Sequence, residues 1–411
     1  DATDRASGFV VGRVGRLMAD VLPGLDATGA WEIPARLNMA AQCLSHDPAR
    51  RAIIDLTGEA RRDVSFGTLS DMVDGLARAL AQRVQAGDRV GVLLGQSPWC
   101  AAAHLAIWKI GAISVPLFKL FKYDALASRV RDAGVTLVLT DPEGRDLLGG
   151  LATPLMADSV GVAGDPVAFA DTGPDDPAVL IYTSGTTGSP KGALHGHRVL
   201  TGHLPGVSLS HDVLGQDGDC LWTPADWAWI GGLFDVAMPA LALGVPVVAA
   251  RLAKFSSDAC ARIIREGDVR NVFFPPTALR MLKAEGATIA RLRSVASGGE
   301  PLGAEMLAWG QQAFGLSINE FYGQTECNMV ATSAGSQFPP RPGCIGKPVP
   351  GHDVEVLDDA GAPTAGEGDV AIRKGSAAMM LGYWQRPDET AQKFRGDWML
   401  TGDRGVFDGE Y

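Results

Sequence analysis

Apolar residues alternate between helical and strand spacing along the first third of the chain. Between residues 69 and 80 they share one face of a helix, at Leu69, Met72, Val73, Leu76, Ala77 and Leu80. The segments that follow predict a strand at Val90–Leu94, a helix at Ala101–Ile110, a strand at Ile113–Leu117, a helix at 124–133 and a strand at 136–140. This alternation predicts parallel strands covered by helices on both faces of a sheet.

The alternation restarts near Ala178. Strands are predicted at Val179–Thr183, Val245–Ala249, Asn271–Phe274, Ser294–Ala296 and Asn319–Tyr322, with helical segments between them. Two separate runs of strands favour two α/β subdomains over one very wide sheet.

The pattern changes beyond residue 335. The stretch Gln337–Gly351 is rich in Pro and Gly and is typical of a loop. After it, Asp353–Leu357 and Asp369–Arg373 predict short strands, with a helix only near 388–394. The predicted organisation is an N-terminal arm (1–30), a first α/β subdomain (31–177), a second α/β subdomain (178–335) and a small β-barrel-like subdomain (336–411).

Composition narrows the class of protein. A chain of 411 residues is too long for one core, and 46% hydrophobic with 20% charged residues is ordinary for a globular enzyme. The net charge of −11 disfavours nucleic-acid binding. No apolar run is long enough to cross a bilayer, and residues 1–16 lack the apolar core of a signal peptide. The six cysteines include no CxxC pair, which favours reduced thiols and a cytoplasmic location.

A segment rich in glycine and hydroxyl residues, Tyr182–Gly192, follows the apolar strand Val179–Ile181. Its glycines allow turns that expose backbone N–H groups, and its hydroxyls and lysine add donors and charge, which suits a polyphosphate better than a plain surface loop. It is not a Walker A loop, because Ser189 and Pro190 separate Gly188 from the lysine. The candidate phosphate-binding residues are Thr183, Ser184, Gly185, Thr186, Thr187, Gly188 and Lys191.

This loop resembles the signature of the adenylate-forming (AMP-binding) superfamily, which includes the acyl-CoA synthetases, and in particular their medium-chain type. The resemblance covers nearly the whole chain from Trp31, because further motifs recur in the family's order. They are Ser297–Pro301 (SGGEP), Tyr322–Glu326 (YGQTE), Gly346–Pro348 (GKP), Gly382–Trp384 (GYW) and Thr401–Asp403 (TGD). The resemblance implies the large N-terminal part of such an enzyme, with the fold described above.

The resemblance also implies roles for individual residues. An aromatic ring at Tyr322 would stack on adenine, the Thr325 hydroxyl would reach the α-phosphate, and Glu326 would bind Mg²⁺. Asp403 would accept hydrogen bonds from the ribose hydroxyls. The implied nucleotide-binding set is completed by Gly299, Glu300, Pro301, Gly323 and Gln324, and the implied catalytic residues are Lys191, Thr325 and Glu326. Taken singly, Asp403 could be a turn cap and Glu326 a solvated acid.

The implied reaction is attack by a carboxylate on the α-phosphorus of ATP, with release of pyrophosphate, followed by attack of the CoA thiol on the acyl-AMP. Catalysis then consists of positioning and charge neutralisation. The implied ligands are ATP, Mg²⁺, CoA as co-substrate and a small carboxylic acid. No nucleic acid or membrane span is expected, and a homo-oligomer is left open.

The segment Thr223–Gly232 resembles the acid-binding segment of short- and medium-chain acyl-CoA synthetases. Trp227 and Trp229 are candidates for the wall of an apolar acyl pocket, and ordinary core aromatics are the alternative for each. The two histidines after the phosphate loop, His195 and His197, are expected to be structural or at the pocket edge, because the reaction needs no general base.

The size of the acid is expected to depend on Gly323. In the family, acetyl-specific members carry a bulky Trp at this position of the motif. The glycine therefore predicts an acid longer or bulkier than acetate. Amino-acid-activating relatives place an Asp where Gly231 stands here, so the chain lacks that ammonium anchor; Asp235, one turn further on, could supply another.

The family's small mobile C-terminal domain, with the lysine that drives adenylation, is expected to be absent from these residues. Neither Lys374 nor Lys393 is expected to replace that lysine. Two alternatives stay open: an enzyme that loads a carrier-protein thiol instead of CoA, and a non-catalytic nucleotide-binding module.

Overall fold

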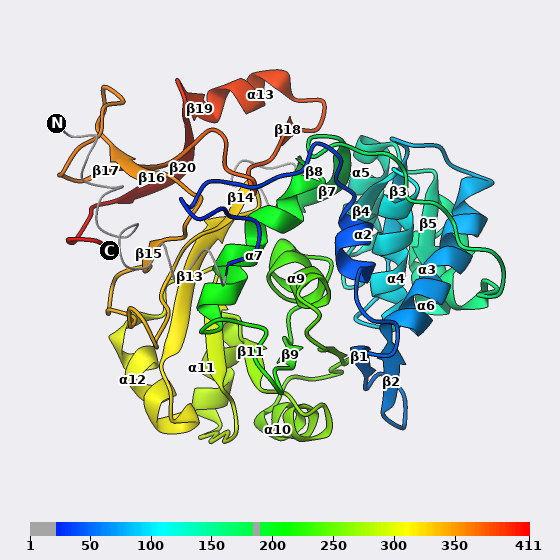
Figure 1. Ribbon diagram of the computed structural model, residues 1–411, viewed down its shortest axis with the longest axis horizontal. Coiled ribbons are helices and arrows are strands. Elements are labelled where there is room, and N and C mark those ends of the chain that lie inside the picture. The colour runs from blue at the N-terminus through cyan, green and yellow to red at the C-terminus, as the bar shows by residue number, and fades with distance from the viewer. Residues whose placement is uncertain (1–21, 184–189) are drawn as a thin grey trace.

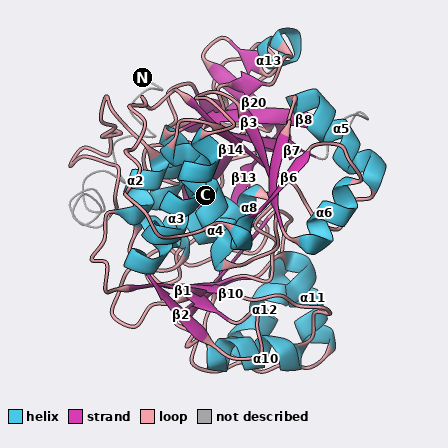
Figure 2. Cartoon of the chain, turned by 90° about the vertical axis from the view of Figure 1, so that its right-hand side faces the viewer, coloured by secondary structure: helices cyan, strands magenta, loops and turns pink. Residues whose placement is uncertain are grey.

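The computed structural model describes residues 22–183 and 190–411. Within these residues the strands form two large sheets and one small sheet, and helices cover the large ones (Figures 1 and 2). The N-terminal arm therefore lies largely outside the described residues. The predicted class, an α/β protein with parallel sheets and a small β subdomain, is confirmed.

The seven-stranded sheet is built mainly from the first third of the chain. Its order is β18 (Gly382–Tyr383), β8 (Lys191–Gly196), β7 (Pro177–Thr183), β4 (Ile113–Pro116), β3 (Arg89–Leu93), β5 (Leu137–Thr140) and β6 (Thr153–Met156). The strands from β7 to β6 are parallel to one another. At the β7 edge, β8 pairs antiparallel with β7, and β18 pairs antiparallel with β8.

The nine-stranded sheet holds the second run of strands. Its order is β15 (Lys347–Pro348), β14 (Cys327–Thr332), β13 (Ile318–Gln324), β12 (Ser294–Gly298), β11 (Asn271–Phe273), β9 (Leu221–Trp222), β10 (Val247–Ala249), β1 (Arg51–Asp55) and β2 (Arg62–Ser65). The small antiparallel sheet contains β16 (Val354–Leu357), β17 (Gly368–Arg373), β20 (Trp398–Gly405) and β19 (Phe394–Arg395).

The α-helices lie between these strands in the chain. They are α2 (Met39–Leu44), α3 (Phe66–Ala81), α4 (Pro98–Lys109), α5 (Tyr123–Ala133), α6 (Pro142–Leu148), α7 (Arg198–Ser210), α8 (Ile230–Gly232), α9 (Met238–Ala242), α10 (Ser257–Glu266), α11 (Pro276–Ala284), α12 (Gly303–Phe314) and α13 (Pro387–Gln392). A 3₁₀ turn covers Ala157–Ser159, and a π-helical turn, η2 (Leu233–Ala237), joins α8 to α9.

Local sequence explains where several helices begin and end. The side chains of Ser65, Ser97 and Asp141 each accept a hydrogen bond from a backbone N–H in the first turn, which caps α3, α4 and α6. The helix α5 ends at Gly134, whose φ of 64° is the left-handed conformation that favours glycine. These signals agree with the helices predicted where α3, α4 and α5 lie, whereas α6 was not predicted.

The strand alternation places two different cores on the two faces of the seven-stranded sheet. Along β7, Val179 and Ile181 join the core with α3 and α4, whereas Leu180 and Tyr182 face the core with α5 and α6. Figure 2 shows α5 and α6 on one side of these strands and α2, α3 and α4 on the other.

The chain crosses between the two large sheets, so the expected boundary at residue 177 does not separate them. β1 and β2 precede that boundary but belong to the nine-stranded sheet, where β1 pairs with β10 and β2 pairs with β1. β7 and β8 follow it but belong to the seven-stranded sheet, where β7 pairs with β4 and β8 pairs with β7. Apolar periodicity reports that a strand is buried, but not which distant strand lies beside it.

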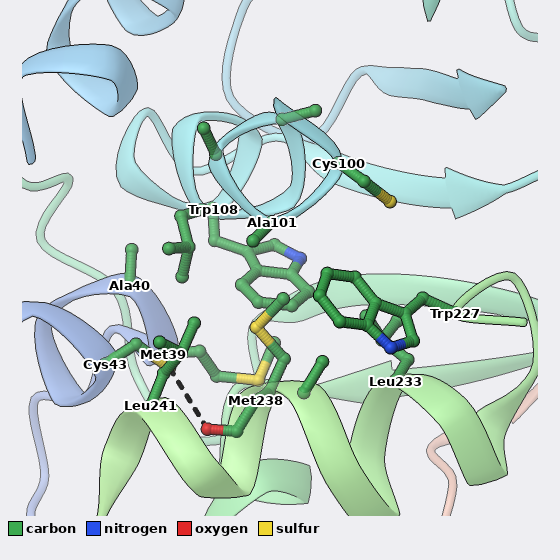
Figure 3. Close-up of a cluster of buried hydrophobic side chains, with 14 of the residues drawn as sticks. Met39, Ala40, Cys43, Cys100, Ala101, Trp108, Trp227, Leu233, Met238 and Leu241 are labelled. Atoms are coloured by element: carbon green, nitrogen blue, oxygen red, sulfur yellow. Dashed lines mark hydrogen bonds between the residues drawn. The ribbon is translucent and has the colours of Figure 1, made fainter. Parts of the chain in front are cut away.

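A dry core joins the two large sheets. The helix α4 is buried on all sides, and Trp108 packs near Met238 of α9 and near Trp227 (Figure 3). The Trp108 indole nitrogen donates to Ser114 Oγ at 3.1 Å and to the Ala178 carbonyl at 2.8 Å. The core therefore fixes the carboxyl ends of one sheet relative to those of the other.

The helix α7 links both large sheets to the loop that leads to β18. A Cβ on Gly202 would lie 2.5 Å from Ala377 C and 2.6 Å from Ala378 Cα, both in that loop. We expect Gly202→Ala to destabilise the fold by about 1–3 kcal/mol despite alanine's better helix propensity, because the backbone must move apart. Denaturant unfolding measures this, with Gly58→Ala as the control because nothing lies near its added Cβ. Equal midpoints for the two variants would contradict this close packing.

Candidate active site

Lys191 and Glu326 meet at one tyrosine. The Tyr383 hydroxyl donates to Glu326 Oε1 at 2.5 Å, and the Lys191 ammonium lies 5.3 Å from the centre of the Tyr383 ring. Glu326 is 9% exposed, at the turn between β13 and β14. Burial, and then the hydrogen bond to Glu326, raise the pKa of Tyr383, so its hydroxyl stays a donor. The lysine turn and the acidic turn thus share one site.

Lys191 is held by an acid from the small β subdomain. Its ammonium lies 2.5 Å from Glu389 Oε2, and both side chains are partly exposed. The hydrogen bond from Lys191 lowers the pKa of Glu389, so this carboxylate is ionised at neutral pH. Arg386 reaches both Glu389, at 3.2 Å, and Asp132 on α5, at 3.4 Å. The sequence interpretation did not identify Glu389, because its contact joins α13 to β8, which are far apart in the chain.

A second contact joins the YGQTE turn to β20. The Tyr322 hydroxyl donates to Asp403 Oδ2, and burial followed by this bond raises the pKa of Tyr322. Gln324 Nε2 and Lys393 Nζ both donate to the Thr401 carbonyl, at 3.1 and 3.2 Å. The small sheet therefore closes one side of the site.

Lys393 is an additional cation at this position. Burial lowers its pKa most, the Lys191 charge also lowers it, and the carboxylates of Glu326 and Asp403 raise it. A half-buried ammonium near two carboxylates can contact an anionic ligand, although nothing in the local sequence around Lys393 distinguished it.

The remaining candidate nucleotide-binding residues lie in two segments of the chain. Gly299, Glu300 and Pro301 are exposed just beyond the carboxyl end of β12, next to β13, with Gly299 at a φ of 100°. Glu300 pairs there with Arg280 at 2.7 Å. Thr183 ends β7, while Ser184, Gly185, Thr186, Thr187 and Gly188 lie outside the described residues.

The two candidate pocket tryptophans have different surroundings. Trp227 is fully buried in the core beside Trp108 and Leu233 (Figure 3), so it is a core aromatic. Trp229 is partly exposed, and its ring lies 5.5 Å from Phe118 and 5.7 Å from Phe121, centre to centre. Trp229 thus stands where the two large sheets meet.

Gly323 and Gly231 face different neighbours. A Cβ on Gly323 would lie within 3.0 Å of the Asn328 side chain and of Asn328 Cα, so the space beside it is already filled. The glycine makes room for Asn328, and the free volume expected from the missing indole is not present at this point. A Cβ on Gly231 would lie 3.2 Å from the Phe273 ring and 3.6 Å from Asp235 Oδ2.

His195 and His197 are buried and support neighbouring backbone. His195 Nε2 lies 2.8 Å from the Thr325 carbonyl oxygen, and the Met39 N–H donates to His197 Nδ1 at 3.1 Å. Burial lowers the pKa of His195 to about 3 and that of His197 to about 4. Both rings are therefore neutral at physiological pH, and the first one positions Thr325.

Buried histidines predict loss of stability in mild acid. Burial lowers the pKa to about 3 or 4 in His104, His195, His197, His203, His211 and His352. Below about pH 6.5 the unfolded chain binds protons that the folded chain does not, so stability falls as pH falls. Each such histidine costs about 1.4 kcal/mol per pH unit. We expect a lower urea midpoint at about pH 5 than at pH 7.5.

A variant tests the origin of that effect. His104 is buried in the apolar core, and neither of its ring nitrogens has a hydrogen-bond partner. His104→Leu should therefore remove about one of the protons that the chain takes up on unfolding in acid, so that stability falls less steeply as pH falls. A midpoint that does not change between the two pH values would exclude this account.

Within the described residues, no helix is both long and apolar enough to span a membrane.

Mg²⁺ is commonly held by one or two carboxylates together with substrate phosphates, and Glu326 offers one such carboxylate beside two lysines. The residues present therefore fit a magnesium ion that arrives with a nucleotide.

Comparison with known proteins identifies the family. Residues 40–384 match the family model described as AMP-binding enzyme. The chain is 29% identical to an acetyl-coenzyme A synthetase of Bacillus subtilis over 390 residues, which cover 86% of the chain and 67% of that protein. It is 27% identical to the human acyl-coenzyme A synthetase ACSM4 over 426 residues, covering 92% and 72%.

Solved structures agree with this assignment. An acyl-CoA synthetase from Brucella canis superposes with a TM-score of 0.83 at 27% identity, covering 98% of this chain and 77% of that one. An ATP-bound MatB from Rhodopseudomonas palustris gives 0.78 at 25% identity, covering 90% and 76%. Because the family model matches residues 40–384 and the fold agrees with it, the chain belongs to the AMP-binding enzyme family.

Proposed function

We propose that the protein is an acid–CoA ligase that activates a carboxylic acid with ATP and passes the acyl group to CoA. The observation that carries the proposal is the contact of Tyr383 with both Lys191 and Glu326. It puts a cation beside a carboxylate that would hold Mg²⁺, which supports transfer of the adenylyl group of ATP to a carboxylate. The names of the matched relatives support the same reaction class.

The nucleotide would lie along the line from Lys191 to Asp403. Lys191, Thr325 and the Ser184–Gly188 loop would bind its phosphates, and Asp403 would accept from the ribose hydroxyls. Tyr322 would contact the adenine together with the Gly299–Pro301 segment. Glu326 would hold Mg²⁺, which, when bound, neutralises charge on the phosphate oxygens.

The reaction depends on positioning the substrates more than on general acid or base catalysis. A carboxylate oxygen of the acid bonds to the α-phosphorus while the bond to pyrophosphate breaks, and the CoA thiolate then bonds to the acyl carbon as AMP leaves. Lys191 would draw charge from the phosphate oxygens, and His195 would fix the Thr325 backbone. The buried histidines remain neutral and transfer no proton.

The acid would enter between Trp229 and Gly231, near the seam of the two large sheets. We propose an acid longer or bulkier than acetate on the basis of the aromatic rings beside Trp229, because Asn328 fills the space beside Gly323. The rings of Trp229, Phe118 and Phe121 supply apolar surface on the side of the seven-stranded sheet.

The reaction is tested on the full-length protein with a panel of carboxylates, measuring pyrophosphate release with CoA, with other thiols and without a thiol. Glu326→Gln should reduce magnesium-dependent release about a hundredfold, because one charged ligand is lost. The matched control is Glu367→Gln, which changes an exposed acid paired with Arg404. Unchanged rates in the Glu326 variant would remove the metal assignment, and acetate as the best substrate would remove the size proposal.

A second variant tests the role of Lys191. ATP phosphates must displace Glu389 from its ammonium, so Glu389→Gln should lower the KM for ATP about two- to fivefold, the range expected for a partly exposed ion pair. Glu305→Gln, which breaks the exposed pair with Lys283, is the control and should leave KM unchanged. Weaker ATP binding in the Glu389 variant would mean that Glu389 assists the nucleotide instead of competing with it.

A further inference from the structure

A cavity lies at the end of the nine-stranded sheet opposite to the candidate active site. It has a volume of about 800 Å³ and is lined by α10 and by the loops that lead into β9, β11 and β12. These strands are parallel, so the loops that precede them meet at the amino edge of the sheet, whereas Glu326 follows β13 at the carboxyl edge. Figure 1 shows α10 at the lower end of the molecule and β18 and β20 at the upper end. The cavity is therefore separate from the candidate nucleotide site.

Three exposed arginines line this cavity. Arg265 lies on α10, Arg270 in the loop before β11, and Arg291 in the loop before β12. Among the lining residues that the structure describes, Asp268 is the one acid, and its carboxylate already accepts a hydrogen bond from Arg61 at 2.7 Å. The cavity is thus locally cationic in a chain whose net charge is −11.

The guanidinium groups of Arg270 and Arg291 have no partner in the described part of the chain. Neither forms an ion pair or a side-chain hydrogen bond there. Arg265 approaches a carboxylate only at 3.8 Å, and that carboxylate, Glu266, is closer to Arg262, at 3.1 Å. The positive charge of the cavity is therefore available to a ligand.

An adjoining smaller cavity shows how arginines are otherwise used at this edge of the sheet. It shares Gly218 with the larger cavity, and its two arginines are satisfied by the protein. Arg50 donates to the Gly244 carbonyl at 2.7 Å, and Arg51 lies 2.7 Å from Asp63. The unpaired state of Arg270 and Arg291 is thus not a general property of the surface here.

The loop that carries Arg291 also presents backbone donors. The N–H groups of Ala290, Arg291 and Leu292 have no acceptor among the residues that the structure describes. Arg291 has a φ of 76° and Asp268, in another loop that lines the cavity, a φ of 52°, which is the left-handed region that side chains rarely adopt. Successive N–H groups around such a residue form concavities that bind anions, and strained backbone of this kind gathers at ligand sites.

The two loops that bear Arg270 and Arg291 are fixed to each other. The Arg293 N–H donates to the Arg270 carbonyl at 2.6 Å. The Arg293 guanidinium donates to both carboxylate oxygens of the buried Asp219, at 2.6 and 2.7 Å, and to the Asp212 carbonyl at 2.9 Å. Loops that are held in place before a ligand arrives lose less conformational entropy on binding.

We propose that this cavity binds a small anion that carries two or more phosphate groups. A guanidinium presents its N–H donors in a planar fork that suits phosphate oxygens, and three of them can neutralise an anion with several charges. The volume lies in the range of small-molecule sites and exceeds the need of one phosphate group. The inference does not depend on the proposed acid–CoA ligase function, because the cavity lies at the other edge of the sheet.

The test is a calorimetric titration of the full-length protein with inorganic pyrophosphate at about 0.1 M salt, which screens weak surface attraction. The Lys191→Gln variant is used throughout, so that binding at the candidate active site is weakened. We expect saturable binding to one site per chain. Adding Arg270→Gln and Arg291→Gln together should weaken it about tenfold or more, because hydrogen bonds from charged groups are lost. Thermal unfolding establishes that each variant is folded.

A control variant and two further probes complete the test. Arg83→Gln should leave the affinity unchanged, because Arg83 is equally exposed but bonds only to the Ala79 carbonyl, at 2.7 Å. Citrate should bind more weakly than pyrophosphate, since concavities of backbone N–H groups suit phosphate. ADP is the second phosphate probe, and the tighter of the two shows whether the site prefers a nucleotide or a free polyphosphate.

Two results would overturn the proposal. One is the absence of pyrophosphate and ADP binding in the Lys191→Gln variant. The other is an affinity that falls no further with Arg270→Gln and Arg291→Gln than with Arg83→Gln, in which case the arginines are only a solvated surface. Tighter binding of citrate than of pyrophosphate or ADP would overturn the assignment of the ligand class.

Discussion

The site depends on an edge-strand pairing that joins distant parts of the chain. β18 adds to β8 with Tyr383 opposite Ala193, two residues from Lys191, and the Tyr383 hydroxyl then reaches Glu326 on the other large sheet. Backbone hydrogen bonds fix the strand to within one register position, since a slip would turn the ring to the opposite face. A single aromatic residue therefore sets the distance between Lys191, the proposed phosphate-binding lysine, and the acidic turn.

The site places positive and negative side chains close together, which suits both the phosphates of a nucleotide and a metal cation. Lys191 is neutralised by Glu389, Lys393 lies near Glu326 and Asp403, and Tyr383 and Tyr322 each donate to one carboxylate. Partial burial lowers the effective dielectric constant and strengthens these interactions. The network holds the side chains in place before a ligand arrives, which reduces the conformational entropy lost on binding.

The acid pocket shows how a glycine can be misread from sequence alone. The sequence predicts free space beside Gly323, but the neighbouring Asn328 occupies that space and bonds to Asp235. A missing side chain gives free volume only where no neighbour moves in, because protein interiors are close-packed. The proposed size of the acid therefore rests on the aromatic rings beside Trp229 and not on Gly323.

The sequence by itself determined the fold class, many of the central helices and strands, and the motifs that assign the family. These follow from local chemistry: apolar periodicity, capping residues and glycines at fixed spacing. Only the tertiary structure decided that β1 joins β10, that Trp227 is core while Trp229 stands at the seam, and that Tyr383, Glu389 and Lys393 belong to the site. Such contacts join residues far apart in the chain, 57 positions for Tyr383 and Glu326. A local pattern reports that a side chain is buried or polar, but it carries no information about which remote group will meet it.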